Sequence, residues 1–140
     1  MNELQVIREH LATQRRHLSE VIQACSAALQ GSAAEGTETQ ALLRACASYF
    51  ELALGRLAGN SEAAALARRA SASAQPLSSW QALLAAVHAE SGQWFDAIDA
   101  LASRDGPLLQ WRQIAHVDAD TILGERQRFE RVQALRTAHG

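Results

Sequence analysis

Apolar residues recur at steps of three and four over four long segments of the chain, at residues 4–29, 37–57, 77–101 and 108–137. This spacing places apolar side chains on one face of an α-helix, and no segment has the strict alternation of a half-buried strand. The composition agrees, because 29 of the 140 residues are Ala, a strong helix former with little preference for strands. The sequence therefore predicts an all-α protein.

Short breaks separate these segments, at 31–36, at Gly59-Asn60 and at Asp105-Gly106-Pro107. Long amphipathic helices with short connections favour an up-down antiparallel four-helix bundle, which we expect to form a single domain over residues 1–140. The stretch 61–74 is rich in Ser and Ala, and it predicts a short extra helix between the second and third long helices. We expect this stretch to be mobile, because such small side chains bury little surface.

Capping-box spacing marks the start of two long helices. Thr37 stands three residues before Gln40, and Ser78 stands three residues before Gln81. In a capping box each side chain satisfies a free backbone N–H group at the helix start. We therefore expect helices to begin near Thr37 and Ser78, and we expect Pro107 at or near the first position of the last helix.

The charge and the hydropathy pattern limit the partners. The formal net charge is −2, so there is no basic excess to neutralise phosphates and we expect no nucleic-acid partner. No run approaches the roughly 20 apolar residues of a membrane span, and the residues after Met1 do not resemble a signal peptide. We expect a cytoplasmic protein with no membrane partner, in which Cys25 and Cys46 stay reduced.

Both thiols lie on core-facing stripes, where packing is the usual role and a redox pair is the alternative.

Histidines lie at the edges of two apolar stripes. His10 and His17 are seven residues apart, so they project within about 20° of each other on the first helix. Two histidines on one helix face can ligate a metal, but such a pair more often consists of half-buried, solvated boundary residues. His88 lies at the edge of the third stripe, either as a ligand or as a hydrogen-bonded residue at the core boundary.

Acidic residues give further candidates. His116 and Asp120 are four residues apart on one face of the last helix, a usable ligand pair. Asp118 and Glu125 fall within the main apolar stripe of that helix. Since carboxylates are rarely buried alone, we expect both at the bundle edge, with an Arg partner or a cation as the alternatives. Glu62 follows the Gly59 break, where a carboxylate in a first helical turn suits the positive helix end.

The sequence has no catalytic motif. It contains no Gly-rich phosphate loop, no G-x-S-x-G motif and no recognisable nucleophile–base pair, so we predict that the protein is not an enzyme. A protein partner or a homodimer is a candidate, because two arginine clusters are typical either of interfaces or of a solvated face. These clusters are Arg68 with Arg69, and Arg126 with Arg128 and Arg131. If Trp80, Trp94 and Trp111 do not all fit in one core, those that remain outside it would also mark an interface.

Three short stretches are similar to three helices of one family. They are Ile7-Arg8-Glu9-His10 through Arg16-His17-Leu18, the run Leu84-Ala85-Ala86-Val87-His88-Ala89-Glu90, and His116-Val117-Asp118-Ala119-Asp120 with Leu123. In this order they resemble the first, third and fourth helices of the hemerythrin-like, HHE cation-binding proteins. That family holds a non-haem di-iron centre in a four-helix bundle. The resemblance implies a ligand set of His10, Glu62, His88, His116 and Asp120.

The chain departs from the family at several ligand positions. Ala58 stands where the family has a second-helix His, and Leu84 and Gly92 flank His88 where a second His is usual. The resemblance therefore implies a hemerythrin-like bundle with an incomplete metal site and a binding or regulatory role, without a cofactor. The alternative is a carrier or sensor of oxygen or metal that binds non-haem iron.

Overall fold

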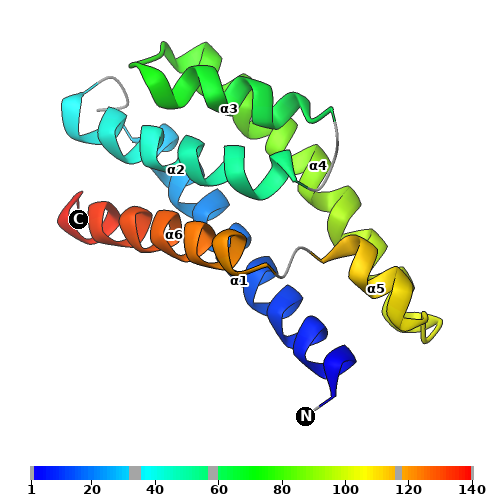
Figure 1. Ribbon diagram of the computed structural model, residues 1–140. Coiled ribbons are helices and arrows are strands. Elements are labelled where there is room, and N and C mark those ends of the chain that lie inside the picture. Colours follow the sequence, from blue (N-terminus) through cyan, green and yellow to red (C-terminus); the bar gives the residue numbers. More distant parts are fainter. Residues whose placement is uncertain (1, 32–35, 57–59, 116–117, 140) are drawn as a thin grey trace.

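The computed structural model describes residues 2–31, 36–56, 60–115 and 118–139 (Figure 1). Its helices are α1 (Glu3–Gln30), α2 (Thr37–Gly55), α3 (Glu62–Ala72), α4 (Leu77–Ser103), α5 (Leu108–Ile114) and α6 (Ala119–His139). The described residues contain no strand, so the all-α prediction is confirmed.

Helix α1 follows the sequence pattern closely. The Asn2 side chain accepts a hydrogen bond from the backbone N–H of Gln5 at 2.8 Å and so caps the first turn. The helix ends at Gln30, directly before Gly31. Its predicted stripe is the buried face, which includes Ile7, Leu11, Leu18, Ile22 and Cys25.

Neither predicted capping box forms. Helix α2 has Gly36 as its N-cap and α4 has Pro76, and neither start has a side-chain cap. The Gln40 amide makes tertiary bonds instead: it accepts from the Gln75 backbone N–H at 3.1 Å and from Trp80 Nε1 at 3.2 Å. Because Gln40 is buried between α2 and the start of α4, its polar atoms serve the packing of two helices.

The short extra helix between the second and third long helices is confirmed as α3. The Ser61 hydroxyl caps it by accepting from the Ala64 N–H at 2.9 Å, and Glu90 Oε2 of α4 accepts from the Ala63 N–H at 2.8 Å. The expectation that this stretch buries little is wrong. A face of four alanines is buried, namely Ala63, Ala64, Ala67 and Ala70.

The prediction of one continuous last helix is wrong, because α5 and α6 are separate. Ala115 has extended backbone angles of φ −108° and ψ 131°, which end α5. Helix α6 then begins after Asp118, whose Oδ1 accepts from the Thr121 N–H at 2.8 Å as an N-cap does. This local capping competes with continuation of the helix, and the apolar periodicity alone does not reveal it.

The turn between α4 and α5 depends on glycine. Asp105 has a positive φ of 50°, and the Gly106 N–H donates to the Leu101 carbonyl at 2.9 Å. A Cβ atom at Gly106 would lie 1.9 Å from Leu101 Cδ1, so no larger residue fits without a shift. The predicted break at Asp105-Gly106-Pro107 is confirmed, with Pro107 as the N-cap of α5.

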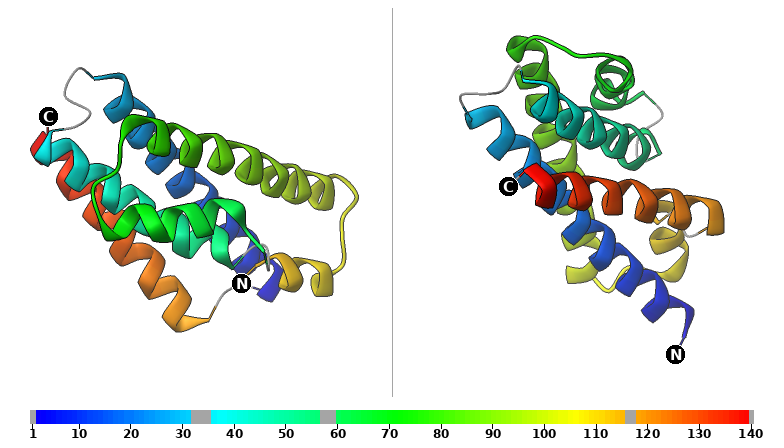
Figure 2. Two further views of the ribbon diagram at one scale, coloured as in Figure 1. Left: turned by 90° about the horizontal axis from the view of Figure 1, so that it is seen from above. Right: turned by 90° about the vertical axis from the view of Figure 1, so that its left-hand side faces the viewer.

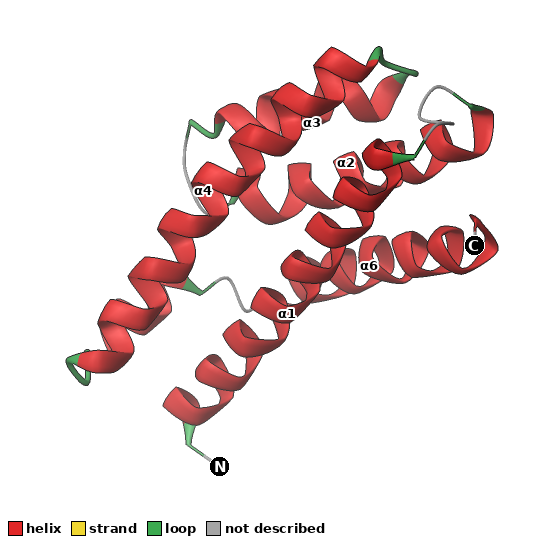
Figure 3. Ribbon diagram, turned by 180° about the vertical axis from the view of Figure 1, so that it is seen from behind, coloured by secondary structure: helices red, strands yellow, loops and turns green. Residues whose placement is uncertain are grey.

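Helices α1 and α2 organise the packing. Helix α1 contacts α2, α4, α5 and α6, while α2 also contacts α3, α4 and α6. Figure 1 shows α3 and α6 on opposite sides of α2, and the two views in Figure 2 agree. Seen from behind, α1 lies along the near side of the molecule (Figure 3). No described helix is long and apolar enough to cross a membrane.

Tryptophan and cysteine side chains belong to the core. Trp80, Trp94 and Trp111 are 0%, 8% and 3% exposed, so none of them marks a surface interface. Cys25 and Cys46 are fully buried free thiols on facing helices. A hydrogen bond with Cys25, together with burial, raises the pKa of the Cys46 thiol well above its ordinary value. The Cys46 thiol therefore stays protonated, and both buried cysteines contribute to the packing of the core.

Candidate functional site

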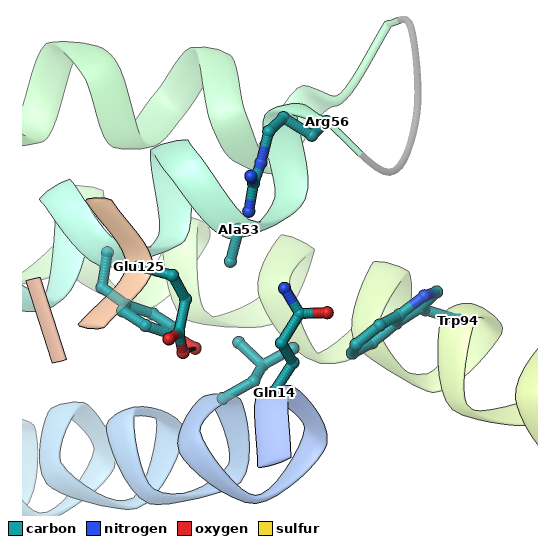
Figure 4. Close-up of a pocket in the computed structure, with 7 residues that line it drawn as sticks. Gln14, Ala53, Arg56, Trp94 and Glu125 are labelled. Carbon is teal, nitrogen blue, oxygen red and sulfur yellow. Dashed lines mark hydrogen bonds between the residues drawn. The ribbon is translucent and has the colours of Figure 1, made fainter. Parts of the chain in front are cut away.

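A group of polar side chains lies within the helical core, between α1, α2, α4 and α6. We call it the polar centre and define it by Gln14, His17, Tyr49, Arg56 and Glu125. Figure 4 shows Gln14, Arg56 and Glu125 around one small pocket, with Trp94 at its side. Polar groups with such burial need partners inside the protein, and those partners are what distinguish a structural network from a ligand site.

Glu125 is the most buried charged residue of this centre, at 4% exposure. Its Oε1 accepts hydrogen bonds from the Tyr49 hydroxyl and from His17 Nδ1, both at 2.7 Å. Burial, reinforced by the Glu125 carboxylate, raises the pKa of Tyr49 far above its ordinary value, so the phenol remains a neutral donor. The His17 ring is also stacked on Phe129, with centroids 3.8 Å apart.

The predicted edge position of Glu125 is therefore wrong. Two donors from α1 and α2 replace the lost water around the carboxylate, so it can lie in the core. Its hydrogen-bond partners are His17 and Tyr49, and not the Arg that the sequence offered as an alternative. Asp118 does lie at the edge: it is exposed and caps α6.

The other side of the pocket holds Arg56 and Gln14. Arg56 is half-buried, and its Nε donates to the Leu52 carbonyl of its own helix at 3.1 Å. Burial lowers the pKa of Arg56, while Asp118 and Glu125 oppose that shift. Arg56 Nη1 is buried and has no hydrogen-bond partner within the described part of the chain, and Gln14 lies across the same pocket.

The pocket between these groups is small. Its volume is about 10 Å³, and its walls are Gln14, Leu18, Tyr49, Ala53, Arg56, Trp94 and Glu125. A cavity of about 10–15 Å³ on this measure holds one water molecule. The polar centre therefore has room for a bridging water and not for a substrate or an organic cofactor.

His10 lies beside the polar centre, one helical turn before Gln14 on α1. Burial lowers the pKa of His10; Glu125 acts in the opposite direction, and the nearby Arg56 and His17 lower it further. His10 Nε2 is buried, and it has no hydrogen-bond partner among the described residues. The imidazole is therefore neutral at neutral pH and sits in a site that disfavours its charged form.

The other members of the predicted ligand set that the structure describes are not part of this centre. Glu62 and Asp120 are exposed in the first turns of α3 and α6, and His88 is exposed on α4. His116 and Ala58 lie outside the described residues. Among the residues described, no group of three or more His, Cys, Asp or Glu side chains is placed to hold a metal ion. These residues thus do not fit a di-iron centre, and the full five-residue set stays a prediction.

Three members of the polar centre had no role in the sequence prediction. Gln14 has the clearest signal, because it interrupts the apolar stripe between Leu11 and Leu18. Tyr49 lies on the apolar stripe of α2, where its spacing predicts only a core residue. Arg56 follows the last residue of α2, where nothing in the local sequence indicates that it turns inward.

A second polar region lies on the surface, between α2, the end of α3 and α6. We call it the arginine groove; it has a volume of about 330 Å³ and is lined by Ala41, Arg44, Ala45, Ser48, Ser71, Arg128 and Arg131. It brings together two arginines of the predicted second cluster and one from α2. Arg68 of the first cluster instead pairs with Glu51 at 3.2 Å, and Arg69 and Arg126 are exposed.

Comparison with known protein-family models, curated proteins and solved structures yields no match for this chain.

Proposed function

We propose that this protein is a small binding module with a regulatory role, that it is not an enzyme, and that it acts through its surface. We further propose that α1, α2, α4 and α6 form a hemerythrin-like, up-down four-helix bundle. The order and spacing of the three resembling stretches support this architecture. The polar centre supports it too, because bundles carry their polar sites on facing helices in the core.

One observation carries this proposal: the buried carboxylate of the polar centre is bound within the protein, and the pocket beside it has room for a single water. Glu125, its buried anion, is bound by His17 and Tyr49. No nucleophile beside a base and no space for a substrate accompanies this group in the described structure. The centre then holds helices in register, and recognition falls to the exposed surface, where the arginine groove forms a cavity of about 330 Å³.

The alternative is a non-haem iron protein that carries or senses oxygen or a metal. It would need at least three ligands around one ion, with a free coordination position. Of the implied ligands that the structure describes, only His10 lies near the polar centre, and no described residues complete such a set. We therefore place the surface-binding role first.

Metal analysis separates the two proposals. The protein is expressed in iron-supplemented medium, purified without chelators, and examined by elemental analysis and absorption spectroscopy. We expect iron far below one atom per chain and no ligand-to-metal absorption band. Stoichiometric iron that His10→Ala or His88→Ala removes, and that the control His139→Ala retains, would overturn the proposal in favour of the iron protein.

A further inference from the structure

The arginine groove suggests what the surface recognises. We propose that it binds the phosphate group of a small phosphorylated molecule, with Arg44, Arg128 and Arg131 as the phosphate-binding residues. This inference rests on the proposed surface-binding function and adds the chemical class of the ligand to it.

Arg44 is held in place by the end of α3. Its Nε donates to the Ser71 carbonyl at 3.2 Å and its Nη2 donates to the Ala72 carbonyl at 3.3 Å. These bonds fix the plane of the guanidinium group and leave Nη1 without a hydrogen-bond partner among the described residues. A fixed guanidinium loses less rotamer freedom when it binds an anion, so this arrangement is preorganised.

Arg128 and Arg131 approach from α6. They are three residues apart, so they lie on the same face of the helix. Arg128 Nη1 donates to the Gly124 carbonyl at 3.2 Å, while its Nε is buried and lacks a partner within the described structure. A buried donor without an acceptor is costly, and a bound oxyanion would satisfy it. Arg131 is exposed beside it.

The charge of the groove is uncompensated. Its lining residues include three cations and no carboxylate. None of these three guanidinium groups forms an ion pair with another described residue, whereas Arg15, Arg68 and Arg112 do. Three cations on one groove of a chain with net charge −2 favour a ligand with several negative oxygens. A phosphate monoester provides these, and guanidinium groups bind it through paired, charge-assisted hydrogen bonds.

The size of the groove indicates a small molecule and not a polymer. A volume of about 330 Å³ lies at the lower end of small-molecule sites. A nucleic acid would instead need an extended basic surface, which this acidic chain does not have. The alanines Ala41 and Ala45 supply an apolar wall for the organic part of the ligand.

The test is a titration followed by the arginine Nε–H signals in NMR, with inorganic phosphate and phenyl phosphate as probes and chloride at matched ionic strength as the reference. We expect saturable shifts at Arg44, Arg128 and Arg131, and tighter binding of phenyl phosphate. Arg131→Gln should weaken binding about tenfold, the effect of one lost charge-assisted contact. Arg131→Lys should weaken it as well, because a lysine keeps the charge but loses the planar pair of donors.

Arg126→Gln is the matched control, since Arg126 is exposed on α6 and is not part of the groove lining. Circular dichroism verifies that each variant is folded. Equal weakening by Arg126→Gln and Arg131→Gln, shifts that do not saturate, or an equal response to chloride would overturn the phosphate site. Tighter binding of a single-stranded oligonucleotide than of phenyl phosphate would overturn it too. In iron-free protein these results would refute the phosphate site and leave the surface-binding proposal standing.

Discussion

Charged side chains have different surroundings in the polar centre and in the arginine groove. In the polar centre one buried carboxylate, Glu125, is satisfied by donors from two other helices. In the groove three guanidinium groups gather on the surface without any carboxylate. A buried charge must find partners within the chain, because bulk water does not reach it. Exposed cations stay solvated, so they remain available to a ligand. The comparison indicates that the first region supports the fold and the second supports recognition.

The largest effect should come from removing the buried carboxylate. Glu125→Ala leaves the Tyr49 hydroxyl and His17 without their shared acceptor, and we expect a loss of about 3 kcal/mol in the free energy of unfolding. Urea denaturation followed by circular dichroism measures it. Glu130→Ala, an exposed site on the same helix, should change stability by less than about 0.5 kcal/mol. Similar losses in both variants would show that Glu125 is not the key residue of a buried network.

A smaller loss is expected when one donor is removed. Tyr49→Phe deletes only the hydroxyl that donates to Glu125 and should lower the free energy of unfolding by about 1.5 kcal/mol. In a double-mutant cycle with Glu125→Ala, the two losses should add to more than the loss in the double variant, because both remove one hydrogen bond. Strict additivity would contradict the direct contact.

A substitution in the arginine groove should weaken phosphate binding and leave the free energy of unfolding almost unchanged. Arg131→Gln should leave the free energy of unfolding within about 0.5 kcal/mol of the wild type, because it removes no buried contact. Saturating phosphate should raise the thermal midpoint of the wild type, since a ligand stabilises the state that binds it, and should raise that of Arg131→Gln less. A strongly destabilised Arg131→Gln variant would show that the arginine groove, like the polar centre, supports the fold.

The smallest effect should be a pH dependence from His10, which faces Glu125, Arg56 and His17. Its pKa in the folded protein lies below the ordinary value of 6.5, so the unfolded chain takes up this proton first as the pH falls. The stabilising contribution is complete above about pH 6.5 and decreases as the pH falls toward the lower folded-state pKa. Urea denaturation between about pH 7.5 and pH 5.5 should show this loss. His10→Gln should reduce the slope of the free energy of unfolding against pH. An unchanged slope would show that the pH dependence comes from another group.

Much of the fold was predictable because helices depend on local spacing. The stripes of α1, α2 and α4, the short helix α3 and the break at Gly106 all match the sequence prediction. The division between α5 and α6 does not, because the capping by Asp118 is a weaker signal than the apolar period around it. The predicted capping box at α2 fails for a tertiary reason. Gln40 is buried, and its side chain forms hydrogen bonds with Gln75 and Trp80, which are distant in sequence, instead of capping the helix.

The candidate sites were less predictable, because they depend on contacts between distant residues. His10 and Glu125 were recognised as candidates, but the importance of Tyr49 and the burial of Glu125 follow from packing. Arg128 and Arg131 were named as a cluster, whereas Arg44 joins them only because α2 and α6 pack together.

The sequence by itself determined that this protein is helical and where most of its helices lie, because periodicity and helix propensity act over a few neighbouring residues. Only the tertiary structure decided which polar residues are satisfied. Glu125 meets Tyr49 across 76 positions and His17 across 108, and such pairings exist only after the helices have packed. The same packing leaves Arg44, Arg128 and Arg131 together on the surface without an anion.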